Sequence, residues 1–294
     1  MNAAPGLLPP DSLTVFSARE SPAALLATVE AARRAAAGLA TVHVLVNGNP
    51  ALAAALRAAA ARWGDVDIES LAHADKAAAW NHALHAGWRG EARMFFCDGY
   101  VLLAPAAVRA LRDALVAEPA ALAGSGVPAA GRSAMALRAA MLADGGMHGN
   151  FCCLTSAAVQ AIRNRGLRLP QGLYRGEALW RALCCYSFDP ATHAWRDDRV
   201  VVAGQACWSF PPLRAWHPLD WRASWRRRLR QAQGDLENLA ARDHLSLRRL
   251  PPEALPATVF ELIDAWRLRN PAAFRQALAA DWRRRLAWHR LQRG

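Results

Sequence analysis

The chain has 294 residues, of which 53% are hydrophobic and 20% charged, so it can bury a sizeable core and is not a disordered polypeptide. No run approaches the ~18 to 20 apolar residues that span a bilayer and no secretory signal pattern is present, which excludes an integral membrane protein and argues against a secreted one. The net charge of +12 is unevenly placed, because residues 1–150 carry 12 basic and 12 acidic side chains whereas residues 151–294 carry 24 and 12.

The first 123 residues alternate apolar, β-prone segments with helix-forming ones. Strands are predicted at 13–16, 42–46, 66–71 and 93–97. A helix is predicted to begin at Ser21-Pro22, and another to follow the turn at 47–50 and run through Trp63. Two more are predicted at 74–86 and 105–116. This alternation is typical of a parallel sheet covered by helices, in which ligands bind beyond the carboxyl ends of the strands. The loops of interest are therefore 18–21, 47–50 and 98–100.

The pattern is weaker after residue 123. Residues 124–150 are rich in glycine, alanine and methionine and give no secure assignment. A strand is predicted at 151–154, a helix capped by Ser156 as far as about residue 163, a helix at 177–186 and a strand at 200–202. The six cysteines include two adjacent pairs and no C-x-x-C, so buried reduced thiols are expected rather than disulfides or a structural zinc site.

Five segments carry motifs in a characteristic order. They are 13–21 (LTVFSARES), 44–49 (VLVNGN), 76–84 (KAAAWNHAL), 95–101 (FFCDGYV) and 149–161, which begins with Gly-Asn-Phe. In order and spacing they resemble the family 2 glycosyltransferases with the GT-A fold. There the first segment forms a strand and a nucleotide-contacting loop, the second has the turn V-D-x-G-S, the third reads K-A-x-A-x-N-x-A-L, the fourth F-L-D-A-D, and the fifth begins the acceptor half.

The resemblance, over roughly residues 12–235, implies the fold and its division. The fold class would be α/β of the GT-A type, a Rossmann-like, mostly parallel sheet with helices on both faces. Residues 1–11 would form a flexible leader, 12–123 the nucleotide-sugar-binding half, 124–212 the acceptor half and 213–294 a basic, Trp-rich helical extension.

The family's D-x-D motif is altered in this chain. Its carboxylates normally hold a divalent metal on the donor diphosphate, since hard cations prefer oxygen ligands. Here Asp98 and Gly99 are followed by Tyr100, and a neutral phenol is a poor ligand for Mn²⁺ or Mg²⁺. Three alternatives remain open. Asp98 binds a divalent cation together with a downstream histidine, His148 or His217; arginines replace the charge of the metal; or the site is inactive.

The resemblance assigns other residues to the donor site. They are the loop residues Ala18, Arg19 and Glu20, the turn residue Asn47, the helix residues Lys76 and Asn81, and the Asp98-Gly99-Tyr100 turn at the diphosphate. For Asn47 a plain Asn-Gly turn is the alternative to a nucleotide contact. Lys76 is the only lysine of the chain and would contact phosphate as a point charge; an ordinary surface lysine is the alternative.

Glu177 stands where the family has its E-D pair and is the candidate general base for the acceptor hydroxyl. Gly176 occupies the position of the preceding acid. The alternative is a solvated glutamate at a helix start, where the helix dipole favours it.

The C-terminal segment concentrates charge and tryptophan. Residues 214–294 carry 17 basic against 8 acidic side chains. Two helical stripes are predicted, Trp221, Trp225, Leu229 and Leu236, then Phe274, Leu278, Trp282 and Leu286, both flanked by arginines. Tryptophan beside arginine suits the surface of an anionic membrane, and packing of the stripes on the core is an equal alternative. No nucleic-acid partner is expected, because no recognisable binding module accompanies the basic residues.

The sequence thus predicts a cytoplasmic, inverting glycosyltransferase that uses a nucleotide-diphosphate sugar and an acceptor that the sequence does not name, with peripheral contact to the inner membrane face as an option. The alternative is a non-catalytic relative that binds a nucleotide sugar or acts as a scaffold. The missing second Asp and the missing acid before Glu177 favour that alternative.

Overall fold

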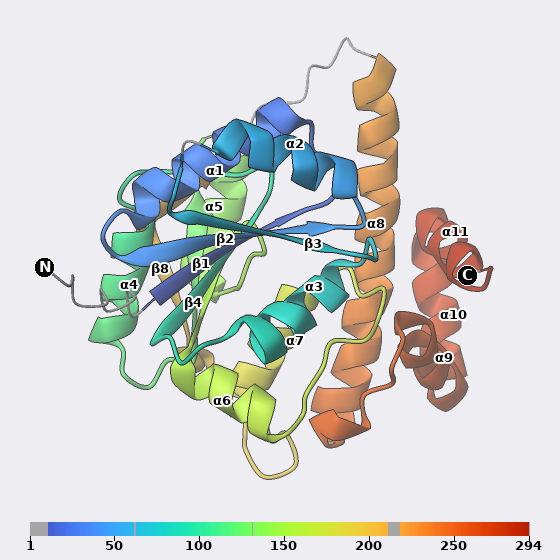
Figure 1. The fold of residues 1–294 in the computed structure, drawn as a ribbon. Coiled ribbons are helices and arrows are strands. Elements are labelled where there is room, and N and C mark those ends of the chain that lie inside the picture. Colours follow the sequence, from blue (N-terminus) through green and yellow to red (C-terminus); the bar gives the residue numbers. More distant parts are fainter. Residues whose placement is uncertain (1–10, 62, 131, 211–217, 294) are drawn as a thin grey trace, which may run out of the picture.

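The structure is a computed structural model that describes residues 11–61, 63–130, 132–210 and 218–293. An eight-stranded sheet lies at its centre (Figure 1). Its strands are β1 (Asp11–Ser17), β2 (Ala40–Asn47), β3 (Val66–Leu71), β4 (Arg93–Asp98), β5 (Leu102–Leu103), β6 (Ala123–Pro128), β7 (Phe151–Thr155) and β8 (Val200–Ser209). The spatial order is β3-β2-β1-β4-β7-β6-β8-β5. The first four strands pair in parallel and β8 is parallel to β6, whereas β7 and β5 run antiparallel to their neighbours.

Helices cover both faces of this sheet, as Figure 1 shows. One face packs against α1 (Pro22–Ala36), α2 (Pro50–Ala60) and α4 (Ala107–Ala117), and the other against α3 (Lys76–His82), α6 (Ser156–Asn164) and α7 (Gly176–Cys185). The side chains of β4 alternate between the two cores, because Phe95 belongs to the first and Phe96 to the second. The predicted α/β sheet with helices on both faces is confirmed.

Several boundaries differ from the predicted ones. Thr155, not Ser156, caps α6, since its side chain accepts a hydrogen bond from the Ala158 amide. The helix predicted at 74–86 ends as α3 at His82 and continues as a π-helical turn (Ala83–Gly87), and α2 ends at Ala60. The unassigned stretch 124–150 contains most of β6 and all of α5 (Arg132–Asp144).

Gly126 shows why β6 carries no strand signal in the sequence. A Cβ atom at this position would lie 2.3 Å from the Ala206 carbonyl oxygen and 2.6 Å from Cδ1 of Phe151. The pairing of β6 with β8 shifts register between Gly126 and Val127. Close approach of two backbones therefore requires glycine here, although glycine has low strand propensity.

We expect Gly126→Ala to destabilise the fold by about 1–3 kcal/mol or more. The added methyl group would clash with the Ala206 carbonyl oxygen, and a backbone atom cannot move away as a flexible side chain can. Denaturant unfolding followed by circular dichroism would measure the change. Gly64→Ala is the matched control, since a Cβ atom at Gly64 meets nothing within 4 Å. Equal stability of the two variants would contradict this account of β6.

The C-terminal region is helical and continuous with the core. It consists of α8 (Pro218–Arg242), α9 (Val259–Arg269), α10 (Pro271–Ala280) and α11 (Trp282–Leu291). In Figure 1, α8 stands beside the sheet and the other three helices lie on its outer side. Leu236, Trp266 and Trp288 belong to the same buried cluster as the residues of α3, α6 and α7. This part of the chain therefore shares a core with the preceding part.

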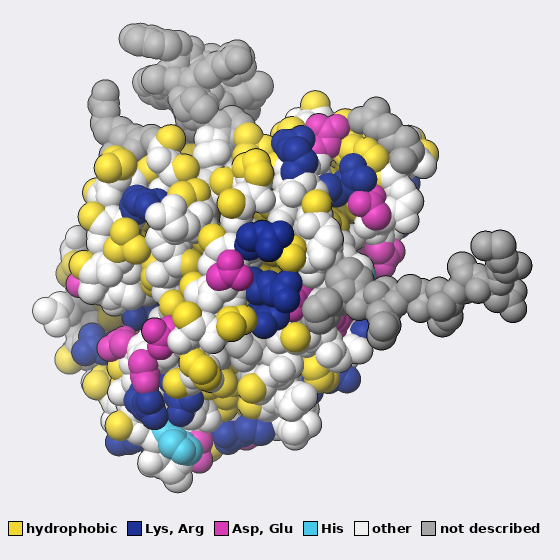
Figure 2. Space-filling model, turned by 90° about the vertical axis from the view of Figure 1, so that its left-hand side faces the viewer, with side chains coloured by type: hydrophobic (Ala, Val, Ile, Leu, Met, Phe, Trp, Pro, Cys, Tyr) yellow, Lys and Arg dark blue, Asp and Glu magenta, His cyan; other side chains and the backbone are white. Residues whose placement is uncertain are grey.

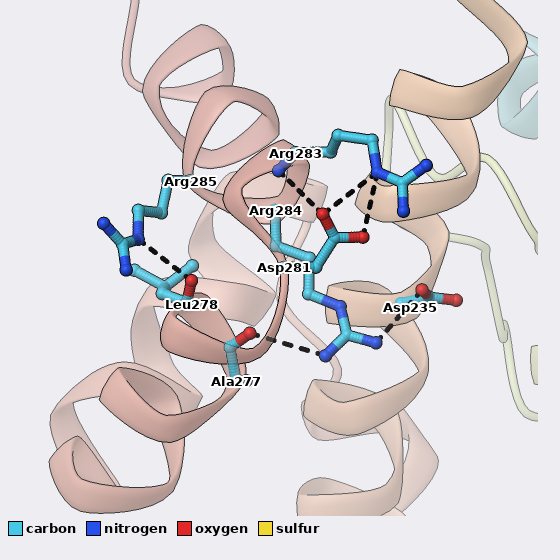
Figure 3. A network of polar contacts seen from close by, with 7 residues as sticks. All are labelled: Asp235, Ala277, Leu278, Asp281, Arg283, Arg284 and Arg285. Carbon is cyan, nitrogen blue, oxygen red and sulfur yellow. Dashed lines mark hydrogen bonds and ion pairs between the residues drawn. The ribbon is translucent and has the colours of Figure 1, made fainter.

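The second predicted stripe is not one helix, because Asp281 adopts an extended conformation and separates α10 from α11 (Figure 3). The Asp281 carboxylate accepts hydrogen bonds from the backbone amide and from Nε of Arg283. Arg284 donates to the Asp235 carboxylate of α8 and to the Ala277 carbonyl, and Arg285 donates to the Leu278 carbonyl. The arginine run after Asp281 thus fastens α11 to α10 and α8.

Candidate functional site

The carboxyl ends of β1, β2 and β4 lie side by side because these strands are parallel neighbours. Asp98 is the last residue of β4, and Asn47 is the last residue of β2. Lys76 begins α3, which Asp75 caps by accepting a hydrogen bond from the Ala77 amide. Helix α3 follows β3 in the chain, so its first residue is also delivered to this edge of the sheet.

The Asp98 carboxylate is engaged at both oxygens. Nζ of Lys76 lies 2.5 Å from Oδ1, and the two side chains are 28% and 14% exposed. The Tyr100 hydroxyl lies 3.1 Å from Oδ2 of Asp98 and 3.0 Å from Oδ1 of Asn150, so two acceptors face its single proton. Burial acts to lower the pKa of Lys76, but the carboxylates of Asp98 and Glu177 outweigh burial and raise it. Lys76 is therefore a fixed cation.

Glu177 lies close to the same lysine. It sits in the first turn of α7, and an added Cβ atom at Gly149 would lie 3.0 Å from Oε2 of Glu177 and 3.2 Å from Nζ of Lys76. Among the described residues, Oε2 of Glu177 is buried without a hydrogen-bond partner. Burial raises the pKa of Glu177, and the positive charge of Lys76 opposes that shift without cancelling it. The result is a basic carboxylate with a free acceptor atom.

Two arginines complete the charged surroundings. Arg227 of α8 places its guanidinium carbon 6.0 Å from the ring centre of Phe210, whose ring is 6.4 Å from that of Tyr100. Burial, together with the positive charges of Lys76, Arg227 and Arg175, lowers the pKa of His148 to about 4 against the opposing effect of Asp98. His148 is thus a neutral ring, and its Nδ1 accepts a hydrogen bond from the Asn150 amide.

Helix α8 also fixes the second arginine. The buried Glu237 carboxylate accepts hydrogen bonds from the backbone amides of Tyr174 and Arg175 and from Nε2 of Gln233. Burial outweighs the opposing effect of these donors and raises the pKa of Glu237 to about 7. The Arg175 guanidinium pairs with Asp235 at 3.3 Å. One helix therefore positions both Arg227 and the segment that carries Arg175.

The loop after β1 is shaped by its own glutamate. Glu20 Oε2 accepts hydrogen bonds from the Ser17 hydroxyl and from the amides of Ala18 and Arg19, and Nδ2 of Asn49 donates to the Ala18 carbonyl. The side chain of Glu20 is therefore used to hold the loop in place.

Asn47 behaves differently from Glu20. It is 3% exposed, and its Oδ1 has no hydrogen-bond partner among the described residues. A buried acceptor without a partner is costly, which suits a position that a bound donor group would complete.

Two predicted site residues are not part of this cluster as described. Asn81 donates to the Leu169 carbonyl and accepts from the Leu169 amide, and it lines a separate cavity of about 340 Å³ beside Pro252 and Ala257. Its amide thus holds the 166–171 segment. His217 lies outside the described residues.

Comparison with known proteins places the fold. No family model matches the chain, and no curated protein is significantly similar to it. The structure is similar to the mannosyltransferase PcManGT from Pyrobaculum calidifontis, solved with GDP-Man and Mn²⁺, at 18% identity and a TM-score of 0.57, covering 94% of this chain and 74% of that one. It is also similar to glucosyl-3-phosphoglycerate synthase from Mycobacterium tuberculosis, solved with phosphoglyceric acid, at 15% identity and a TM-score of 0.51, covering 82% and 81%. The chain has the GT-A fold.

In this GT-A fold the expected metal site is chemically poor. Within residues 11–61, 63–130, 132–210 and 218–293, no group of three or more His, Cys, Asp or Glu side chains is placed to hold a metal ion. Asp98 would have to give up both Lys76 and Tyr100, and the ammonium group of Lys76 would repel a second cation. The residues described do not fit a divalent ion.

The motifs identified Lys76, Asp98 and Glu177, but sequence reasoning missed Arg175, Arg227 and Glu237. These three depend on how α8 returns across the site, which no local pattern specifies. The available signal was the arginine run of α8, whose members at 227 and 230 occupy a different helical face from the buried Leu229.

Proposed function

We propose that this protein transfers a sugar from a nucleotide-diphosphate sugar to an acceptor hydroxyl with inversion at the anomeric carbon. One observation carries the proposal: a buried carboxylate oxygen of Glu177 without a partner stands beside the Lys76–Asp98 pair at the carboxyl end of a GT-A sheet. The similar structures support the reaction class, since they are a mannosyltransferase with GDP-Man and a glucosyl-3-phosphoglycerate synthase.

The proposed reaction is a single displacement. Glu177 removes the proton of the acceptor hydroxyl while the acceptor oxygen forms a bond to the anomeric carbon. The bond from that carbon to the diphosphate oxygen breaks, and the leaving diphosphate keeps the electron pair. Asp98 holds the Lys76 ammonium in place, and a fixed positive charge near the leaving oxygens stabilises the transition state without reorganisation. Asn47 and the 18–20 loop would contact the nucleotide.

Release of nucleoside diphosphate from a panel of nucleotide sugars, with and without candidate acceptors, would test this function. We expect at least one donor to be cleaved, if only slowly by water, and to raise the melting temperature. Binding without cleavage of any donor would favour the non-catalytic alternative, which the Tyr100 and Gly176 replacements support. Neither binding nor cleavage of any nucleotide sugar would reject both.

We also propose that the protein works in the cytoplasm at an anionic membrane surface. None of the described helices combines the length and hydropathy that a membrane-spanning segment requires. Part of the predicted stripes is core, since Leu229, Leu236 and Phe274 are buried and Leu278 packs against their cluster. Trp225 and Trp282 are exceptions, because they stack at 5.5 Å while staying 39% and 58% exposed.

The charges near this tryptophan pair point the same way. Arg226 and Arg228 follow Trp225 on α8 and are exposed, whereas Arg227 turns toward Phe210. In the view of Figure 2, by contrast, basic and acidic side chains lie next to one another among hydrophobic ones. An exposed aromatic pair beside adjacent arginines is complementary to anionic headgroups.

We expect the protein to sediment with vesicles that contain phosphatidylserine and to be released as salt rises. At 1 M salt the Debye length falls to about 3 Å, so the attraction between arginine and headgroup fades. Replacing Arg226 and Arg228 together with Gln should weaken binding more than Trp225→Ala. The matched control replaces two other exposed arginines, Arg242 and Arg290. Equal, negligible binding to anionic and neutral vesicles at low salt would reject membrane association.

A further inference from the structure

The Asp98 carboxylate is already satisfied by protein groups, unlike that of a metal site waiting for its ion. Lys76 Nζ forms an ion pair with Oδ1 at 2.5 Å, and the Tyr100 hydroxyl lies within hydrogen-bonding distance of Oδ2. A divalent cation entering here would have to displace an ammonium group that two carboxylates favour electrostatically. Charge repulsion between Lys76 and the incoming ion opposes that exchange.

Cationic side chains gather around the Asp98–Tyr100 pair at the carboxyl end of the sheet. Arg227 lies over the Phe210 ring, which packs edge-on against Tyr100. The Tyr100 hydroxyl and Lys76 both contact the Asp98 carboxylate, so Lys76 and Arg227 flank one cluster of side chains. Arg175 also acts electrostatically on His148 and Glu177. Arg175 forms an ion pair with Asp235, and Lys76 forms one with Asp98. Arg227 is exposed, and no carboxylate partner of it is found in the part of the chain that the structure describes. It is therefore the cation most available to an anionic ligand.

Two helices, α3 and α8, fix the positions of these cations. Lys76 is set by the capped start of α3, and Arg227 by α8 with its guanidinium over the Phe210 ring. The Arg175 backbone is held by Glu237. A guanidinium group can bind phosphate oxygens through two parallel N–H bonds, whereas ammonium acts as a point charge.

We infer that Lys76 and Arg227, with Arg175 beside them, bind the diphosphate of the donor in place of a divalent cation. The inference rests on the proposed function. When the bond between the anomeric carbon and the diphosphate oxygen breaks, the leaving group takes the electron pair, and these side chains balance the charge that develops there. Tyr100, in the position of the second D-x-D acid, then serves to hold Asp98 and Asn150 rather than a metal.

Isothermal titration calorimetry of the full chain with UDP, GDP and inorganic pyrophosphate tests this inference. Each titration is done in two buffers, one with excess EDTA and one with Mn²⁺. We expect at least one nucleotide to bind equally well, within about twofold, in both buffers. Arg227→Gln should weaken that binding by about tenfold, which corresponds to about 1.4 kcal/mol. Because Arg227 is exposed, its replacement leaves the core intact. Arg242→Gln, at an exposed arginine of the same helix, is the matched control and should bind as the wild type does.

The outcomes separate the inference from the function on which it rests. Binding that occurs only with Mn²⁺, or that is insensitive to Arg227→Gln, overturns the inference while glycosyl transfer stands. Absence of nucleotide binding in both buffers overturns the proposed function and the inference together. Lys76→Met is a second variant, expected to weaken binding in EDTA by at least about tenfold, with its melting temperature checked in parallel.

Discussion

Glu177→Gln is expected to lower turnover by about 10²- to 10⁴-fold, the usual contribution of a general base, while donor binding stays intact. The variant keeps the shape of the side chain and removes its ability to take up a proton. Initial rates of nucleoside diphosphate release, paired with titration of the nucleotide, would separate turnover from binding. Asp113→Asn, at an exposed acid of α4, is the control and should keep the wild-type rate.

The pH profile gives this prediction a second readout. Burial raises the pKa of Glu177 above its ordinary value, and the base must be deprotonated to act. The rate should therefore rise with pH through that pKa and then level off, and Glu177→Gln should lose this limb of the profile. Wild-type turnover in the variant would remove Glu177 from the mechanism, whatever the donor.

The first half of the sheet was predictable because buried parallel strands appear as continuous apolar runs between turn signals. The segment 42–46 lies within β2, and the helix expected after the turn at 47–50 is α2. β6 was not predictable in this way, because contacts with residues distant in the chain require its Gly126. The approach of the Ala206 backbone and the Phe151 ring to Gly126 explains the residue at that position.

The C-terminal helices show a signal that was available and not used. Asp281 follows Ala280 and its side chain accepts from the Arg283 amide, which is the pattern of a helix N-cap. A break at that point would have divided the second stripe between α10 and α11. It would also have separated the buried Phe274 from the exposed Trp282.

The candidate site also contains residues that local sequence identifies and residues that only long-range packing places. Lys76, Asp98 and Glu177 stand in motifs at strand ends and helix starts, so local sequence identifies them. Arg227 and Glu237 lie in a long polar helix, whose period separates its faces but does not say which polar face lies toward the site. Their roles follow from long-range packing of α8, which periodicity alone does not fix.

Asp98→Ala is the second change with a large expected effect, and we expect it to abolish transfer while the protein stays folded. The carboxylate orients Lys76, so its loss leaves the ammonium group of Lys76 facing Glu177 as its remaining carboxylate neighbour. A stronger pairing with Lys76 would lower the pKa of Glu177 and make it a weaker base. Transfer is therefore lost through the position of the lysine and through the basicity of Glu177 at once.

The decisive comparison is between transfer and nucleotide binding in this variant. If a metal held by Asp98 bound the diphosphate, Asp98→Ala would lose binding in Mn²⁺ together with transfer. If Lys76 and Arg227 bind it, nucleotide affinity in EDTA should persist, because both cations remain in this variant. Titration of UDP and GDP, with the melting temperature as a check on folding, measures both. Full turnover in Asp98→Ala would show that neither arrangement operates, because each requires this carboxylate for transfer.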